Sequence, residues 1–510
     1  MPRWLLALRW TPIALGAAHV ALFAVVAIAR FVHPIELEWM SGGVWDHVER
    51  VASGRPLYVA PSAEFTPFLY PPLHYWLSAV LAKALSIPIA ARLVSVLATL
   101  SAGYGVYTAT RRLAQDRLSA LVALALFAGA YSVTGTWYDL DRSDSLCVAL
   151  LVAAFVTALG GETLRRMAAA GALLGLAFLA KQPAMVFLFV AVGALAFARR
   201  LRMAASLLAG GLAVLVPVMT WLTLSSDGWF WFYCMKMPAS HGMSASLVTL
   251  FFVVDAGKTF ALFGACLVAV ALLVRSREKN DVLLVAFVAA AFLTSASSRM
   301  HKGGWVNGLV FMTTFGAISF GVLRARAASL KQPVLDAVVS GIAIAQLVHF
   351  LYDPGEAMPG PRQLEASAAF HERIAALESG GEVLALAHAH AGRQRHLHAM
   401  ALVDVLRTDH RVPDDLAAAL RDRRYSALVI DEPAGIGLDE LTGERTPLFA
   451  LVASHYAVTE RLADVAPPVV GYPARPTWIM RPRVVPLAES EVDQRIRTEM
   501  AECERVMPLR

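Results

Sequence analysis

Long apolar segments alternate with short polar connections over the first 351 residues of the chain. A helix of about 20 apolar residues crosses the hydrocarbon core of a bilayer. The pattern therefore predicts a polytopic α-helical membrane protein with eleven spans. The predicted spans are residues 11–32, 92–110, 118–134, 145–160, 167–180, 184–198, 204–223, 248–273, 281–297, 308–323 and 333–351.

The connections between these segments are of two kinds. One kind is short and rich in arginine, as at 111–117, 165–166, 199–202, 275–279 and 324–331, and the positive-inside rule places it in the cytoplasm. The other kind is longer, aromatic and mixed in charge: 33–91, 135–144, 181–183, 224–247 and 298–307. With eleven spans the two kinds alternate strictly. The basic flank before the first span predicts a retained signal-anchor helix.

The segment LHYWLSAVLAKALSIPIA (73–90) is apolar as well. Counting it as a span would invert the sidedness of every later connection. Its aromatic start and Lys83 instead favour an interfacial or re-entrant helix on the outer face.

The composition changes after Tyr352, where charged residues and Pro and Gly breaks become frequent. Short apolar runs at 383–390 and 425–432 predict buried strands, and PDDLAAALRDRR (413–424) predicts an amphipathic helix. We therefore expect a membrane domain over 1–352, with an outer loop at 33–91, and a small extracytoplasmic α/β domain over 353–510.

Composition supports the membrane assignment, because the chain is 57% hydrophobic and only 16% charged, against about a quarter charged in soluble domains. The net charge of +6 comes from arginines clustered between apolar runs, so we predict contact with the bilayer and none with nucleic acid. Four cysteines without a CxxC pair predict neither a disulfide framework nor a cysteine metal site.

The chemically loaded residues all fall in the predicted outer connections. They are Glu36 and Glu38 in IELEWMSGG, Asp141, Arg142 and Asp144 in TWYDLDRSDSL, Lys181 in AFLAKQP, and Arg299, His301 and Lys302 in SSRMHKGG. A charge at membrane depth is expensive unless it is paired or wet, so such residues indicate function. Cations suit a phosphate, and a nearby carboxylate suits a general base. The pattern favours a site for a phosphorylated lipid that meets a nucleophile.

Structural alternatives exist for the same residues. The two glutamates can be interfacial charges, Arg142 and Asp144 an internal salt bridge, and Lys181 a cation that snorkels to the interface. The histidines at 388, 390, 396 and 398 resemble a metal cluster. Without a carboxylate or cysteine anchor, however, a strand and a helix would scatter them.

The order of motifs is more specific than any single residue. A carboxylate is followed after about sixteen residues by GRPLY (54–58), then by YPPL (70–73), by RSD (142–144) entering a span, and by Lys181 at a later outer turn. This order resembles bacterial glycosyltransferases of the GT-C superfamily, in particular the protein O-mannosyltransferase and aminoarabinose-transferase group, over roughly residues 11–351.

The resemblance implies an inverting transfer of a sugar from a polyprenyl-phosphate donor, with an acid in the first outer loop as the base. Glu38 matches that acid by its distance to Gly54, and Glu36 is the runner-up, because the family reads Asp-Glu where this chain reads ELEW. Arg142 and Asp144 match the arginine-aspartate motif, and Lys181 matches the helix-end lysine. Metal dependence varies in the group, so the need for a divalent metal stays open.

We therefore predict a multi-pass glycosyltransferase of a bacterial plasma membrane. Glu38, Glu36, Asp144 and Asp141 are its candidate catalytic residues. Arg142, Lys181, Arg299, Lys302 and His301 are its candidate phosphate ligands, and the acceptor is a protein, a lipid or a glycan. A flippase for lipid-linked sugars is the alternative, although it predicts midplane charges and internal repeats. A membrane anchor for a binding module at 353–510 is a further alternative, which the long 33–91 loop disfavours.

Overall fold

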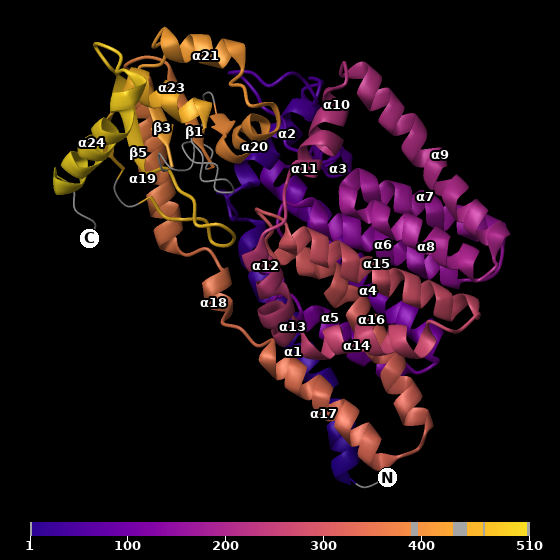
Figure 1. The fold of residues 1–510 in the computed structure, drawn as a ribbon. Coiled ribbons are helices and arrows are strands. Elements are labelled where there is room, and N and C mark those ends of the chain that lie inside the picture. The colour runs from indigo at the N-terminus through magenta and orange to yellow at the C-terminus, as the bar shows by residue number, and fades with distance from the viewer. Residues whose placement is uncertain (1–2, 389–395, 432–445, 463–464, 507–510) are drawn as a thin grey trace. The chain divides into compact units, whose positions relative to one another are not determined.

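The computed structural model describes residues 3–388, 396–431, 446–462 and 465–506 (Figure 1). The chain forms two compact units, each assembled from segments far apart in the sequence. Residues 1–32, 70–222 and 241–357 form one, here called the helical unit. Residues 33–69, 223–240 and 358–510 form the other, here called the α/β unit.

The helical unit contains the long apolar helices. Its elements are α1 (Arg3–Phe31), α3 (Leu73–Leu81), α4 (Ile87–Ala114), α5 (Arg117–Gly129), α6 (Ser143–Leu159), α7 (Leu164–Ala180), α8 (Met185–Phe197), α9 (Leu201–Ser225), α12 (Ala245–Leu250), α13 (Ala256–Lys258), α14 (Phe260–Leu273), α15 (Lys279–Met300), α16 (Val310–Ser329), α17 (Pro333–His349) and α18 (Pro354–Ala357). Short 3₁₀ turns, η1 (Gln182–Ala184) and η4 (Val306–Leu309), precede α8 and α16, and a π-helical turn, η3 (Phe251–Asp255), follows α12.

Each of the eleven apolar ranges predicted from the sequence is largely helical, although α5 ends at Gly129, before the end of the predicted range 118–134. Within the described residues, five helices are long and apolar enough to cross a membrane, or seven if each of two bent helix pairs is one span. The predicted span 248–273 is one of these pairs, since its two halves meet at 100°. The segment 73–90 differs from the prediction of one helix, because α3 ends at Leu81 and α4 begins at Ile87. The count of eleven spans stays a prediction.

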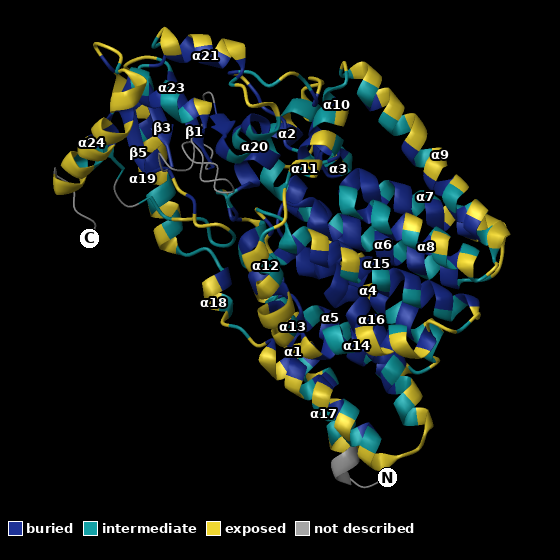
Figure 2. Cartoon of the chain, viewed as in Figure 1, coloured by how far each residue is buried: buried dark blue, intermediate teal, exposed yellow. Residues whose placement is uncertain are grey.

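Small residues let the helices of this unit approach closely. A Cβ on Gly171 of α7 would lie 1.9 Å from the Leu207 carbonyl oxygen of α9, and one on Gly210 would lie 1.9 Å from the Ala168 oxygen. Close backbone approach through small residues is typical of helix packing in membranes. Burial is densest between α4, α6, α15 and α16 (Figure 2). Phe155, Phe287 and Phe315 pack there in tilted and edge-to-face arrangements, at centroid distances of 4.9 to 5.7 Å.

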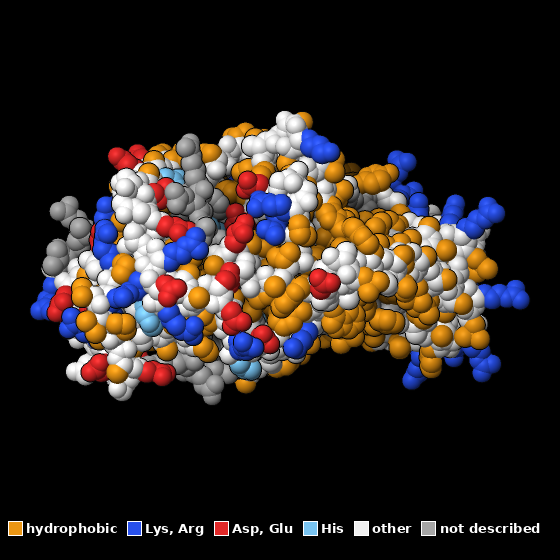
Figure 3. All heavy atoms as spheres, turned by 90° about the horizontal axis from the view of Figure 1, so that it is seen from above, with side chains coloured by type: hydrophobic (Ala, Val, Ile, Leu, Met, Phe, Trp, Pro, Cys, Tyr) orange, Lys and Arg blue, Asp and Glu red, His pale blue; other side chains and the backbone are white. Residues whose placement is uncertain are grey.

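Arginine-rich connections gather at one end of the helical unit. Arg112 donates to the Val156 oxygen near the end of α6 at 2.6 Å, and Lys279 donates to the Ala158 oxygen at 3.0 Å. Arg277 donates to the Phe197 oxygen at the end of α8 at 2.7 Å. Figure 3 shows hydrophobic side chains over much of the helical unit, with Lys and Arg projecting at the helix ends. We call the end of the helical unit that carries Arg112, Arg277 and Lys279 the basic end.

The α/β unit contains one five-stranded sheet and the helices around it. The strands are β1 (Val383–Ala387), β2 (His396–His398), β3 (Ala427–Ile430), β4 (Tyr456–Arg461) and β5 (Trp478–Pro482). The helical elements are α2 (Ser41–Ala52), α10 (Trp229–Trp231), the π-helical turn η2 (Phe232–Lys236), α11 (Met237–Ala239), α19 (Pro361–Glu378), α20 (Ala399–Asp409), α21 (Asp414–Arg421), α23 (Pro447–His455), the 3₁₀ turn η5 (Glu489–Glu491) and α24 (Val492–Val506).

The sheet has the strand order β2-β1-β3-β5-β4. β1 runs parallel to both β2 and β3, whereas β5 pairs antiparallel with β3 and β4. One face of the sheet, including Leu384 and Leu428, packs with residues of α20, α21, α23 and α24, and the other face, including Val383 and Val429, packs with α19. Strands buried on both faces explain the apolar runs from which β1 and β3 were predicted, and the predicted helix at 413–424 is α21.

Residues 33–69 pack with the C-terminal segment, although they precede it by some 300 positions. The Ala63 amide donates to Asp415 at 2.9 Å, and the ring of Tyr58 lies 5.1 Å from that of Phe230. The first outer loop predicted from the sequence is therefore divided. Its first part belongs to the α/β unit, and residues 70–91 belong to the helical unit.

Candidate functional site

The two glutamates of the opening loop lie in the α/β unit, just before α2. Glu38 is fully buried, whereas Glu36 is partly exposed. The Met40 amide donates to Glu38 Oε2 at 3.0 Å, and the Glu38 amide donates to Ser41 Oγ at 3.3 Å. The peptide that leads into α2 therefore holds the carboxylate of Glu38 in place.

Both glutamates line a small pocket of about 50 Å³ inside the α/β unit. Its polar lining includes Gln363 and Ser367 of α19 and Arg475 from the segment before β5. The sequence did not reveal this pocket, which brings residues 35–39 together with α19 and the segment before β5.

The motif cations meet in the helical unit. Arg142 precedes α6, Asp144 lies in its first turn, and Lys181 is the residue that ends α7. Lys181 Nζ donates to Asp144 Oδ1 at 2.5 Å, and their side chains are only 11% and 3% exposed. An acid at the start of one helix and a cation at the end of another also suit the two helix dipoles.

Aromatic and amide side chains complete this cluster. Arg142 Nη2 donates to the Tyr70 hydroxyl at 3.0 Å, and its guanidinium lies 5.2 Å from the Tyr70 ring and 5.7 Å from the Trp137 ring. Lys181 Nζ lies 5.9 Å from the same Tyr70 ring. Asn307 Nδ2 donates to Asp144 Oδ1 at 3.0 Å. We call Tyr70, Arg142, Asp144, Lys181 and Asn307 the cation cluster.

Two aspartates precede Arg142 and have separate surroundings. Asp139 accepts from Arg30 at 3.0 Å and from the Tyr131 hydroxyl at 2.7 Å, so it belongs to a buried structural network. Asp141 is fully buried, and His74 of α3 lies within electrostatic reach of Asp141, Arg142 and Asp144. Asp141 therefore lies beside the cation cluster.

The connection between α15 and α16 carries the remaining candidate cations. Arg299 is buried, pairs with Asp255 at 2.8 Å and donates to the Gly304 oxygen at 3.0 Å. Its charge is therefore already compensated within the fold. His301 Nδ1 lies 2.7 Å from the Lys302 oxygen, and both side chains are partly exposed. The same connection supplies Asn307 to the cation cluster, and the sequence, in which Asn307 follows the same basic motif, did not predict that contact.

The histidines of the C-terminal segment contact acids and backbone. His388 Nδ1 pairs with Asp431, and His396 Nδ1 lies 2.9 Å from Asp46 Oδ2. His398 Nε2 lies 3.0 Å from the Trp39 oxygen, while the fourth histidine, at 390, lies outside the described residues. Across the described residues no three His, Cys, Asp or Glu side chains are grouped to hold a metal ion.

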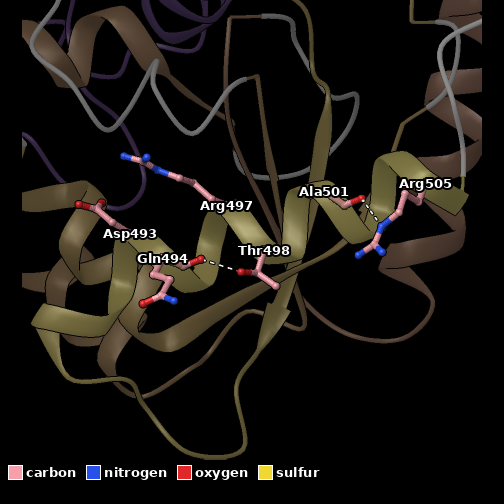
Figure 4. A pocket seen from close by; sticks show the side chains of 6 residues that line it. All are labelled: Asp493, Gln494, Arg497, Thr498, Ala501 and Arg505. Carbon is pink, nitrogen blue, oxygen red and sulfur yellow. Dashed lines mark hydrogen bonds between the residues drawn. The ribbon is translucent and has the colours of Figure 1, made fainter.

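A larger hollow, of about 560 Å³, lies along α24 (Figure 4). Thr498 donates to the Gln494 oxygen at 2.9 Å, and Arg505 donates to the Ala501 oxygen at 3.3 Å, so these groups satisfy their own helix. None of the predicted site residues lines it.

Comparison with known proteins places the fold. Residues 70–223 match the family model of dolichyl-phosphate-mannose-protein mannosyltransferases. No curated protein sequence matches the chain. ArnT from Cupriavidus metallidurans, in a structure bound to undecaprenyl phosphate, is similar with a TM-score of 0.56 and 14% identity, over 92% of this chain and 97% of that one. Its apo structure gives a TM-score of 0.54 and 15% identity, over 91% and 97%.

A more distant likeness has the same architecture. The oligosaccharyltransferase of Archaeoglobus fulgidus tethered to an acceptor peptide has a TM-score of 0.50 and 10% identity, over 94% of this chain and 77% of that one. Together these likenesses confirm the GT-C resemblance inferred from the motifs, and the chain is a multi-pass membrane protein with the GT-C glycosyltransferase fold.

Proposed function

We propose that this GT-C chain is a membrane glycosyltransferase that moves a sugar from a polyprenyl-phosphate donor to an acceptor on the outer face of a bacterial plasma membrane. The observation that carries the proposal is the cation cluster, in which Arg142 and Lys181 lie around Tyr70 at the ends of α6 and α7. The family match over 70–223 includes four of its five members.

In the reaction, the bond between the anomeric carbon and the phosphate oxygen breaks, and negative charge grows on that oxygen. Arg142 and Lys181 offset this charge, because positioned cations in a water-poor site stabilise a developing anion strongly. Tyr70 and Trp137 hold the guanidinium of Arg142 in place. Asp144 and Asn307 fix the ammonium of Lys181. Arg299, His301 and Lys302 are secondary phosphate contacts in this proposal.

The base is Glu38, which accepts the proton of the acceptor hydroxyl while the acceptor oxygen bonds to the anomeric carbon from the side opposite the phosphate. Inversion at that carbon follows from this single displacement. The pocket beside Glu38 and Glu36 supports this role, since a base must reach the proton that it takes. Glu36 and Asp141 are the next candidates.

The lengths of α6 and α7 support an outer location of the cation cluster. Both helices have 17 residues, or about 25 Å, which approaches the roughly 30 Å of a hydrocarbon core. Arg142 and Lys181 lie at one end of these helices, and the opposite ends lie at the basic end. The positive-inside rule then assigns the basic end to the cytoplasm. We retain eleven spans and an extracytoplasmic segment 353–510 as parts of this proposal.

The test uses purified protein in nanodiscs with a panel of polyprenyl-phosphate sugars, with and without EDTA, and measures release of polyprenyl phosphate. Transfer by wild type that is lost in Glu38→Gln and retained in Glu64→Gln, an exposed acid of the same loop, supports the proposal. Retained transfer in Glu38→Gln moves the base to Glu36 or Asp141.

The same preparation tests the flippase alternative. Labelled lipid-linked sugar that crosses a vesicle bilayer, without consumption of any donor, would replace the transferase by a flippase. The outer carboxylates would then be binding groups.

A further inference from the structure

Three contacts tie residues 37–46, which include the first half of α2, to the C-terminal part of the α/β unit. The Val470 amide donates to the Leu37 oxygen at 3.0 Å, and Glu38 and Val470 form an isolated parallel bridge. His398 Nε2 lies 3.0 Å from the Trp39 oxygen. His396 Nδ1 lies 2.9 Å from Asp46 Oδ2. Leu37, Glu38 and Trp39 are consecutive, so the contacts surround the proposed base.

We propose that His398 is a positioning residue for Glu38, and that it acts through the single peptide bond between Trp39 and Met40. This inference rests on the proposed function only for the role of Glu38. It assigns the C-terminal strands a part in catalysis that the order of the sequence does not suggest.

The mechanism lies in the geometry of that peptide. A carbonyl oxygen only accepts, so His398 Nε2 carries the hydrogen and donates it to the Trp39 oxygen. At the other end of the same peptide, the Met40 N–H donates to Glu38 Oε2 at 3.0 Å. Since a peptide unit is planar and rigid, fixing its oxygen also fixes its N–H. His398 thereby sets the direction of the hydrogen bond that holds the Glu38 carboxylate.

The surroundings of His398 keep it in the form that this role needs. Its ring lies 4.8 Å from Phe68, 6.1 Å from Trp39, 5.2 Å from His388 and 5.9 Å from His396. Burial, together with the neighbouring histidines, lowers the pKa of His398 well below its ordinary value, although Asp46 acts in the opposite direction. The imidazole is therefore neutral and has one N–H, which donates a hydrogen bond to the Trp39 oxygen.

Gly471 provides independent support for the pairing of Glu38 with Val470. Its φ of +85° favours glycine, and an added Cβ would lie 2.7 Å from Trp39 Cδ1 and 3.1 Å from Glu38 Cγ. The chain after Val470 can therefore approach Glu38 and Trp39 this closely only with glycine at that position.

The experiment compares wild type with His398→Leu, His398→Gln, His398→Asn and His371→Leu. Leucine removes the donor, the glutamine amide can reach the position of Nε2, and asparagine is too short to do so. His371 is an exposed histidine of α19 in the same unit, so its variant is the matched control. Two quantities are measured: transfer kinetics across pH, and amide hydrogen exchange of the peptide covering residues 37–45 without substrate.

We expect His398→Leu and His398→Asn to lower kcat on the order of 10²-fold with little change in KM for the donor, since small misplacements of catalytic groups have effects of this size. The acidic limb of the pH profile should move to higher pH, because a carboxylate that loses an N–H donor holds its proton more tightly. His398→Gln should restore most of the rate. Amide exchange in 37–45 should accelerate in the leucine and asparagine variants only.

The two measurements separate the possible failures. If wild type transfers sugar and all four variants match it in kcat and pH profile, the positioning role is wrong while the proposed function stands. If wild type transfers no sugar, the proposed function fails, and unchanged exchange in His398→Leu would also overturn the positioning role. If His398→Leu does not fold, equal transfer rates of His398→Gln and His398→Asn would refute the positioning role of His398.

Discussion

Removal of the Lys181 charge should separate the stability of this protein from its activity. Lys181 and Asp144 form a buried pair at 2.5 Å with side chains 11% and 3% exposed, and Asn307 is the second donor to the same carboxylate oxygen. Replacing one partner of a buried pair leaves an uncompensated charge and costs about 3–5 kcal/mol, whereas replacing both is often nearly neutral. Lys181→Met should therefore lose stability that the double variant Lys181→Met, Asp144→Asn largely regains.

Activity should not follow the same course. One positioned donor to a developing anion contributes about 2.7–4 kcal/mol, or about 10²–10³ in rate. Both the single and the double variant should lose transfer by that factor, because neither has the Lys181 cation. The assays are thermal denaturation in nanodiscs and release of polyprenyl phosphate, measured on the same preparations at a temperature where each variant is folded.

Two results would refute this reasoning. A double variant no more stable than Lys181→Met would mean that the two charges do not compensate each other. A double variant that regains transfer together with stability would mean that Lys181 only supports the fold and does not act on the phosphate.

Three further predictions concern the scaffold. Arg30→Met should lower the melting temperature of the helical unit, and adding Asp139→Asn should restore part of it, because the pair is buried at 3.0 Å; equal melting of both variants would contradict this. Gly171→Val should destabilise the protein by about 1–3 kcal/mol or more in thermal melts, because its Cβ would lie 1.9 Å from a backbone oxygen. Gly193 has open space around it, so Gly193→Val is the control and should not destabilise the protein. Equal effects of the two substitutions would refute the packing argument. Burial lowers the pKa of His47 to about 4, so the folded state binds its proton less readily than the unfolded state. Stability of the α/β unit is therefore full above pH 6.5 and falls on acidification, by about 2 kcal/mol between pH 7 and pH 5, a loss that hydrogen exchange should detect and His47→Gln should reduce.

The proposed function makes the C-terminal segment relevant, because that segment contacts the residues on both sides of the proposed base Glu38. The cation cluster lies in the helical unit, while Glu36, Glu38 and their pocket lie in the α/β unit. If Glu38 is the base, a substitution of His398 in β2 should lower the transfer rate although His398 is not a proposed phosphate ligand. The His398 variants test this directly.

The sequence by itself determined the long apolar helices, the strands β1 and β3, and the residue types available for chemistry. Apolar runs of spanning length predicted the helices, because hydrophobic burial acts through the composition and period of each local segment. The same local signal predicted β1 and β3. The order of motifs identified Arg142, Asp144 and Lys181, and the structure brings these three together.

Only the tertiary structure decided which charges meet. It joined Tyr70 and Asn307 to the cation cluster, paired Arg299 with Asp255, and placed the histidines against acids and backbone oxygens. It also buried Glu38 and paired it with Val470, more than 400 positions away. An ion pair or hydrogen bond depends on a few ångströms between groups remote in sequence, and no local period encodes that distance.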